Sequence, residues 1–290
     1  MSKKSSTELT GKTSPFNGFA MTRPDGSPIH VGYSRLSSYS QCPKQFKYSY
    51  VDKIRGKVGA PLLRGQAYHG SLEAMLQFKI DNNMELYPRE RVDKLAIRMA
   101  KKEGLTEAEI YRVIDAVRYY YATLYPEKRP ILVEADFKVV RGGITITGRL
   151  DEADEDGWIV DHKFSYDIWA EPRAKYGYQP IIYQWAGIDQ IERARPGWVF
   201  RGFEYNIIRL FPHPMIQRIR IPRMNQEKSD WWENELFEMA KCMRRDYYPA
   251  NPSEKACAFC FHKELCKPAI YKVEISKLGD QDDPNDAEDL

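Results

Sequence analysis

The pattern of apolar residues changes period near residue 130, and this change constrains the fold more than any other feature. Before it, apolar residues recur at helical spacing. After it, they alternate with polar residues and are rich in β-branched side chains, as in strands. The helices predicted before the change are 35–51, which Pro43 interrupts, 62–78, 89–102 and 107–124. The later elements are predicted as strands over 131–140, 144–151 and 158–163, a helix over 176–191, strands over 199–210 and 215–221, and a helix over 226–245. This order predicts a mixed α/β fold.

The two ends of the chain differ in composition from the middle. Residues 1–30 are rich in Ser, Thr, Lys, Gly and Pro, so we expect a flexible arm there. Residues 276–290 are acidic and are expected to be disordered. Between them, 31–275 is predicted to form a single domain, with a helical insertion at about 80–125. No apolar run is long enough for a membrane span and the start lacks a secretory signal, so we expect a cytoplasmic protein of unknown oligomeric state.

Two acids and a lysine follow apolar residues in the predicted strands. Asp151 ends the segment Gly-Arg-Leu-Asp, and Asp161 and Lys163 belong to Ile-Val-Asp-His-Lys. A turn at Asp156-Gly157 joins the two strands, so Asp151 and Asp161 can meet at one edge of the sheet. Two carboxylates there would bind Mg²⁺ or Mn²⁺, and Lys163 would share their face because it lies two residues beyond Asp161. The alternative is that Asp151 and Asp161 are exposed turn acids. We expect this role for the neighbouring acids, which are Glu152, Asp154, Glu155 and Asp156.

Two predicted helices carry further polar pairs at a spacing of four residues. His69 and Glu73 share a face of the first, and an imidazole is a suitable Mn²⁺ ligand. Gln179 and Tyr183 share a face of the second, where they could hold a phosphate or position Lys163. A buried core histidine and ordinary amphipathic packing are the alternatives.

The five cysteines suggest a metal site rather than disulfides, because their number is odd and the chain is expected to be intracellular. Cys257, Cys260 and Cys266 are closely spaced, and Cys42 is the candidate fourth ligand. Cys242 lies within a predicted helix and is expected to be buried. The spacing alone leaves zinc and an iron–sulfur cluster open, and either would join the two ends of the domain.

These motifs, in this order, resemble the RecB-like branch of the PD-(D/E)xK nuclease superfamily. The segment Tyr33-Ser-Arg-Leu-Ser-Ser-Tyr-Ser-Gln-Cys42 is similar to the N-terminal cysteine helix of its iron–sulfur members, such as AddB-type recombination nucleases and CRISPR-associated RecB-like exonucleases. The motif around His69 resembles the metal-binding histidine motif, Gly148–Asp151 the G-x-x-D motif, Asp161–Lys163 the D/E-x-K motif and Gln179–Tyr183 the Q-x-x-x-Y motif. The superfamily's proline before the first acid is absent, because Leu150 stands there.

The resemblance implies a restriction-endonuclease-like core with a central mixed sheet, an N-terminal helical part and a C-terminal iron–sulfur staple. It implies a DNA nuclease, expected to be an exonuclease on single strands or DNA ends in recombination, repair or phage DNA processing, with replication or recombination proteins as partners. A non-catalytic DNA-binding accessory protein with the same fold is the alternative.

The resemblance also assigns roles to residues. The expected ligands of Mg²⁺ or Mn²⁺ are His69, Asp151, Asp161 and the backbone carbonyl of His162, and a [4Fe–4S] cluster, with Zn²⁺ as the alternative, would be bound by Cys42, Cys257, Cys260 and Cys266. The catalytic residues would be Asp151, Asp161, Lys163, Gln179 and Tyr183. For DNA binding we select basic and aromatic side chains near them, which are Arg149, Lys175, Tyr176 and Tyr178.

Overall fold

The computed structural model describes residues 22–24, 26, 29–54, 56, 59–141, 143–210, 213–258 and 260–266. The chain divides into two compact units. The first comprises residues 1–37 and 58–247, and the second comprises 38–57 and 248–290. The predicted acidic tail, 276–290, lies outside the described residues, as does most of the predicted arm, 1–30.

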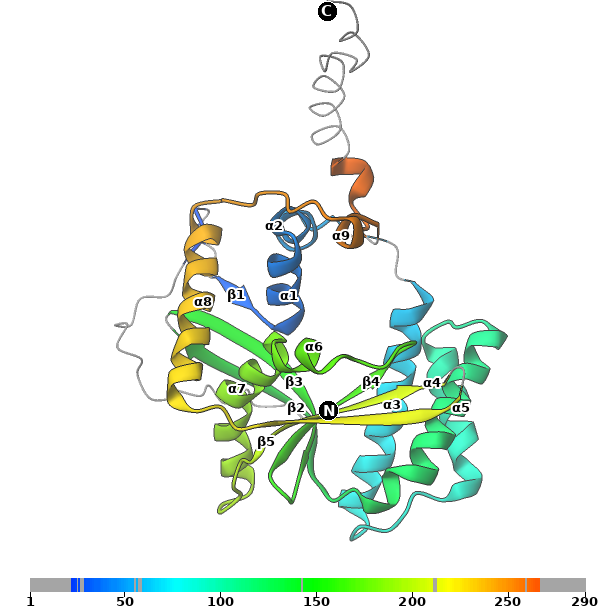
Figure 1. The fold of residues 1–290 in the computed structure, drawn as a ribbon. Coiled ribbons are helices and arrows are strands. Elements are labelled where there is room, and N and C mark those ends of the chain that lie inside the picture. Colours follow the sequence, from blue (N-terminus) through cyan, green and yellow to red (C-terminus); the bar gives the residue numbers. More distant parts are fainter. Residues whose placement is uncertain are drawn as a thin grey trace, which may run out of the picture. The chain divides into compact units, whose positions relative to one another are not determined.

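The first unit is built on a six-stranded mixed sheet (Figure 1). Its strands are β1 (His30–Val31), β2 (Pro130–Arg141), β3 (Ile144–Asp154), β4 (Trp158–Phe164), β5 (Gly202–Arg209) and β6 (Met215–Pro222). The order is β1-β3-β4-β5-β6, and β2 pairs with β3. The β1–β3 and β4–β5 pairs are parallel, whereas β2–β3, β3–β4 and β5–β6 are antiparallel. A mixed α/β fold with a central mixed sheet was predicted, and it is confirmed.

The helices follow the predicted order. Those of the first unit are α3 (Ala60–Asp81), η2 (Arg89–Arg91), α4 (Val92–Lys102), α5 (Glu107–Thr123), η3 (Tyr125–Glu127), α6 (Glu171–Lys175), α7 (Tyr178–Ala194) and α8 (Gln226–Arg244). Helix α1 (Tyr33–Gln41) crosses from the first unit to the second, which also contains α2 (Pro43–Phe46), η1 (Lys47–Val51) and α9 (Glu254–Ala258). The predicted break falls at Cys42, because Pro43 occupies the first position of α2. Among the described helices, none is both long and apolar enough to cross a membrane.

Helices α3, α4 and α5 pack together over one face of the sheet (Figure 1). Their buried cluster includes Tyr68, Val117 and Tyr120, and Ile208 of β5 belongs to it. Helix α7 contacts β2, β3 and β5 through side chains such as Tyr183, which packs on Phe137 and Phe203. Because side chains alternate along a strand, β4 presents His162 to the first face and Asp161 and Lys163 to the second.

Strands β3 and β4 form a hairpin that separates soon after its turn. Gly157 in the turn has a φ of +94°, and a Cβ there would lie 2.2 Å from the carbonyl oxygen of Val199, so glycine is required. The ladder pairs Glu152 with Val160 and Ala153 with Ile159, with no further rungs between these two strands. The next positions along the hairpin are Asp151 and Asp161, so the two acids lie where the strands part.

Candidate active site

Asp151 and Asp161 meet at this point of separation. The backbone N–H of His162 donates to Oδ2 of Asp151 over 2.9 Å, which holds the first carboxylate against the second strand. Lys163 lies on the same face as Asp161, and its Nζ is 2.8 Å from Oδ1 and 2.6 Å from Oδ2 of that residue. Asp161 is almost fully buried, whereas the Lys163 side chain keeps about a quarter of its exposure. The hairpin therefore brings both acids and the lysine into one site.

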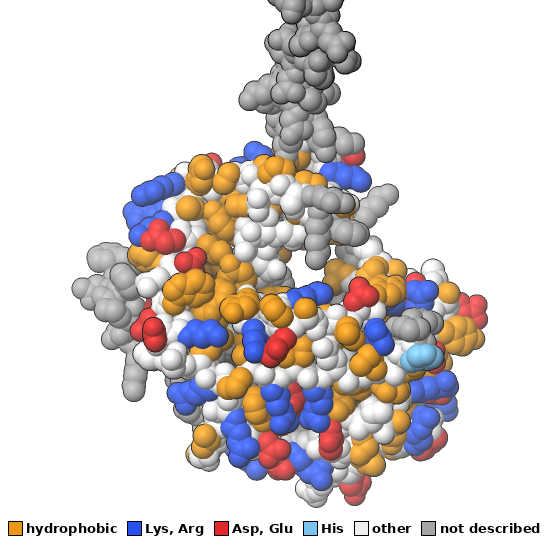
Figure 2. Space-filling view, viewed as in Figure 1, with side chains coloured by type: hydrophobic (Ala, Val, Ile, Leu, Met, Phe, Trp, Pro, Cys, Tyr) orange, Lys and Arg blue, Asp and Glu red, His pale blue; other side chains and the backbone are white. Residues whose placement is uncertain are grey.

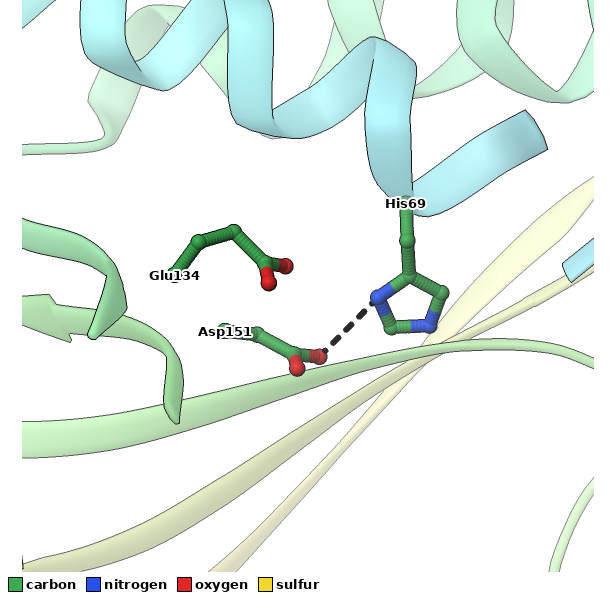
Figure 3. Close-up of side chains that lie close together, drawn as sticks. All are labelled: His69, Glu134 and Asp151. Atoms are coloured by element: carbon green, nitrogen blue, oxygen red, sulfur yellow. Dashed lines mark ion pairs between the residues drawn. The ribbon is translucent and has the colours of Figure 1, made fainter. Parts of the chain in front are cut away.

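Helix α3 adds a histidine to this site, and β2 adds a glutamate (Figure 3). Nδ1 of His69 lies 3.2 Å from Oδ2 of Asp151. The register of β2 against β3, with Val133 opposite Glu152, places Glu134 opposite Asp151. One ligand atom each of His69, Glu134 and Asp151 lies within 4.8 Å of the other two. Among the described residues this is the one such group, and its nitrogen and oxygen atoms suit Mg²⁺ or Mn²⁺.

Glu134 was not among the residues predicted from the sequence. Its strand also carries Asp136 at the same alternation, and nothing in the sequence distinguishes the two acids. The backbone differs, because Glu134 has a φ of +47°, which is rare for a non-glycine residue and often marks a functional site. Burial raises the pKa of Glu134 to about 7, and the negative charges of Asp151 and Glu73 add to this rise. Such crowding of carboxylates is relieved when a cation binds.

The two central acids differ in proton affinity. Burial opposes ionisation of Asp151, but the charges of His69 and Lys163 outweigh it and lower its pKa. Burial raises the pKa of Asp161, and Asp151 adds to that rise against the opposing effect of Lys163. Burial opposes charge on Lys163, yet Asp161 and Asp151 prevail and raise its pKa. Lys163 is therefore a cation at neutral pH and suits stabilisation of negative charge better than proton abstraction.

Gln179 and Tyr183 on α7 connect the two strands from one side. Nε2 of Gln179 donates to Oδ1 of Asp161 and lies 3.2 Å from the Tyr183 hydroxyl. That hydroxyl donates to the backbone carbonyl of Arg149 over 3.0 Å. Gln179 is buried, and its Oε1 has no hydrogen-bond partner among the described residues. These two side chains thus link the Asp161 carboxylate on β4 to the backbone of β3. Their hydrogen bonds go to these groups and not to Lys163.

Glu152 and Asp154 are not solvated turn acids, so that prediction is wrong. Glu152 is fully buried on the opposite face, where its Oε2 is 2.9 Å from Nε2 of His162 and 3.3 Å from Nζ of Lys128. Asp154 is also buried and accepts the N–H of Trp158 over 2.9 Å. Both side chains support the hairpin from within, because a buried carboxylate persists where partners compensate its charge.

The four side chains selected for DNA binding have different surroundings. Arg149 is paired with Asp136, at 2.7 Å, and lies 3.6 Å from Glu134. Lys175 is paired with Glu171 at 2.6 Å. Tyr176 is 67% exposed and is free to stack on a base, whereas Tyr178 packs edge-on against Trp232. Of the four, Tyr176 best fits direct contact with DNA.

Four cysteines lie in the second unit, and Cys242 belongs to α8 of the first, where it is half-buried rather than buried as predicted. Cys42 is the N-cap of α2, where its Sγ accepts the N–H of Asn251 over 3.4 Å. Burial raises the pKa of Cys266, and nearby Cys42, Cys260 and Cys257 raise it further. The fold therefore brings Cys42 near Cys266, although more than 200 residues separate them in the sequence.

A model of the PD-(D/E)XK nuclease superfamily matches residues 30–267. The chain belongs to the PD-(D/E)XK nuclease superfamily. The match covers the whole hairpin with Asp151, Asp161 and Lys163. The acids and the lysine thus lie in a nuclease domain.

One solved structure supports the fold. The crystal structure of a proposed exonuclease from Eubacterium rectale is 14% identical, with a TM-score of 0.55, and the match covers 81% of this chain and 87% of that one. A second structure, SSO0001, is 12% identical over 77% of this chain and 93% of its own, but its TM-score is 0.33, too low for an argument about fold. No curated protein matches the chain in sequence.

Proposed function

We propose that this nuclease is a metal-dependent deoxyribonuclease, acting as an exonuclease on single-stranded DNA or DNA ends. The observation that carries the proposal is the convergence of His69, Glu134 and Asp151 beside Asp161 and Lys163. A module that only binds DNA has no need of three crowded carboxylates and a buried ion pair, since these repel phosphate or cost desolvation.

The residues fit a divalent cation on physical grounds. His69, Glu134 and Asp151 offer one imidazole nitrogen and two carboxylates within coordination reach of a single ion. Asp161 and the backbone carbonyl of His162 are additional proposed ligands. Mg²⁺ or Mn²⁺ bound here would activate a water and stabilise charge on the oxygens of the phosphate.

Each side chain then has a defined task. Asp151 is held ionised by His69 and Lys163, ready to coordinate without first losing a proton. Lys163 remains protonated beside Asp161 and can neutralise the developing charge on the attacked phosphate. Gln179 orients Asp161, and Tyr183 ties Gln179 to the backbone of β3.

The cysteine site is proposed to hold a [4Fe–4S] cluster as a structural staple, with zinc as the alternative. Cys42, Cys257, Cys260 and Cys266 all lie in the second unit, and the first, second and third of these are close enough to Cys266 to raise the pKa of its thiol. Four thiolates are the ligand set that either centre requires. We further propose that the enzyme acts in the cytoplasm on DNA in recombination, repair or phage DNA processing, beside replication or recombination proteins.

The decisive experiment is cleavage of single- and double-stranded DNA labelled at either end, in Mn²⁺ and in EDTA. The wild type should cleave only with Mn²⁺, and release of label as mononucleotides should reveal exonuclease action. Asp161→Asn and Lys163→Met should each reduce the rate at least a hundredfold at a temperature where urea unfolding shows that the variant is still folded. Binding without any cleavage by the wild-type protein would refute the proposal and favour an accessory role.

A further inference from the structure

A small pocket lies at the C-terminal end of β4 and contains two arginines. Its volume is about 50 Å³, enough for about three or four water-sized groups. The residues around it are Pro61, Arg64, Arg112, Phe164, Ser165, Tyr166 and Leu210. One phosphate group, with its oxygens, is of this size.

The polar groups of the pocket are organised around a buried guanidinium. Arg64 is only 4% exposed, and its guanidinium lies 4.8 Å from the centre of the Tyr166 ring. Arg64 donates to Glu109 and to the Tyr166 hydroxyl. Arg112 makes the same two contacts, at 3.4 Å and 3.2 Å. Two arginines thus share one carboxylate, so the group carries a net positive charge.

The pocket is connected to the catalytic residues through two elements. Arg64 precedes His69 by five residues on α3, which is about 7.5 Å along the helix axis. Tyr166 follows Lys163 by three residues, so their Cα atoms are at most about 11 Å apart. These limits leave the pocket within reach of a DNA strand that also contacts the acids, because neighbouring phosphates of a strand are separated by several ångströms.

On the face seen in Figure 2, Lys and Arg side chains alternate with Asp and Glu and form no continuous basic stripe. On that face, placement of a DNA strand would therefore depend on local contacts. Arginine is suited to this task because its planar fork binds phosphate oxygens in pairs.

We propose that Arg112 and Arg64 form a subsite for one phosphate of the DNA strand, one or two nucleotides from the bond that is cut. The proposal rests on the proposed nuclease function and extends it to substrate placement. The half-exposed Tyr166, stacked on Arg64, offers a ring face to the adjoining base. The two arginines would bind the oxygens of an internal phosphate and of a terminal phosphate in the same way, so the bound phosphate is either internal to the strand or terminal.

The test uses oligonucleotides in which one phosphate at a time is replaced by a neutral methylphosphonate. Binding is measured in EDTA, so that it does not depend on cleavage, and cleavage is measured separately in Mn²⁺. We expect one internal position at which the methylphosphonate weakens binding to the wild type about tenfold but leaves binding to Arg112→Gln unchanged. Arg118→Gln is the matched control, because Arg118 lies on the same helix and pairs with Asp93 outside the pocket.

A second series compares ends that carry a phosphate with ends that carry a hydroxyl. A preference for the phosphate that disappears in Arg112→Gln would assign the subsite to a terminal phosphate. If neither series distinguishes Arg112→Gln from the Arg118→Gln control, the subsite is refuted. Position-dependent binding without cleavage by the wild type would support the subsite and refute the nuclease function, so the two failures are distinguishable.

Discussion

Replacing Glu134 with glutamine is expected to change folding stability and metal binding in opposite directions. The pKa of Glu134 rises from an ordinary 4.5 to about 7, chiefly through burial. A group with a raised folded-state pKa stabilises the fold below its unfolded pKa and loses that effect as pH rises through the folded value. The free energy of unfolding of the metal-free wild type should therefore decrease between pH 4.5 and pH 7.

The shift sets an upper limit of about 3 kcal/mol, at 1.36 kcal/mol per pKa unit. Because Glu134 is only partly buried, solvent screening reduces this to about 1–2 kcal/mol. Glu134→Gln should accordingly be about 1–2 kcal/mol more stable than the wild type at pH 8 in EDTA, and no more stable at pH 4.5. In Mn²⁺ the order should reverse, because the variant lacks one carboxylate ligand and binds the ion at least tenfold more weakly.

Urea unfolding at both pH values, with EDTA or with graded Mn²⁺, measures each effect. Asp136→Asn is the matched control, since Asp136 lies two residues away on β2 and its side chain is 72% exposed. It should change neither stability at pH 8 nor the Mn²⁺ dependence by a comparable amount. The reasoning is refuted if Glu134→Gln is less stable than the wild type in EDTA at pH 8, or if it retains wild-type Mn²⁺ affinity.

Three further changes test other parts of the molecule. Asp154→Asn should stabilise the protein by about 1–2 kcal/mol at pH 8 and not at pH 4, because burial raises the pKa of Asp154 to about 6; equal urea midpoints at pH 8 would contradict this. Glu152→Gln should destabilise the protein by about 3 kcal/mol, because Lys128 is buried beside Glu152 and would lose a charged partner. A loss under 1 kcal/mol would show that Glu204, whose Oε1 lies 3.6 Å from Nζ of Lys128, compensates. With the proposed cluster, wild type purified without oxygen should be brown and contain iron and sulfide, and Cys260→Ala should lack all three. A colourless wild type that contains zinc would exclude the cluster.

Much of the fold was predictable because a long segment with regularly spaced apolar residues indicates its own secondary structure. Helix α5 and strands β2 to β4 lie within a few residues of their predicted bounds. The pairing of β1 with β3 was not predictable, since two residues carry no periodic signal and their partners lie more than 100 positions away. The parallel pairing of β4 with β5 likewise depends on the path of α7 across the sheet, which local sequence does not specify.

The candidate site was predictable where a charged residue follows apolar residues in a strand, or where polar residues lie four apart on a helix. Asp151, Asp161 and Lys163 meet the first condition and His69 meets the second, and the structure brings them together. Glu134 meets neither condition, because its role depends on a local backbone conformation and on register with β3. The prediction for Glu152 was wrong for the opposite reason. A run of acids suggests exposure to solvent, whereas Glu152 is buried beside Lys128, which lies just before β2.

The turn at Gly157 has a consequence for how this protein can change. Acidic and basic side chains occupy both faces of the hairpin, with Asp151 beside Glu152 and Asp161 beside His162. If one inserted residue in the turn shifted β4 by one position, Asp161 and Lys163 would turn to the opposite face and His162 would enter the site. Such a variant would keep its overall charge and strand propensity while losing the pairing of Asp161 with Asp151. Length variation in descendants of this chain should therefore be excluded from this turn and accommodated in other connections.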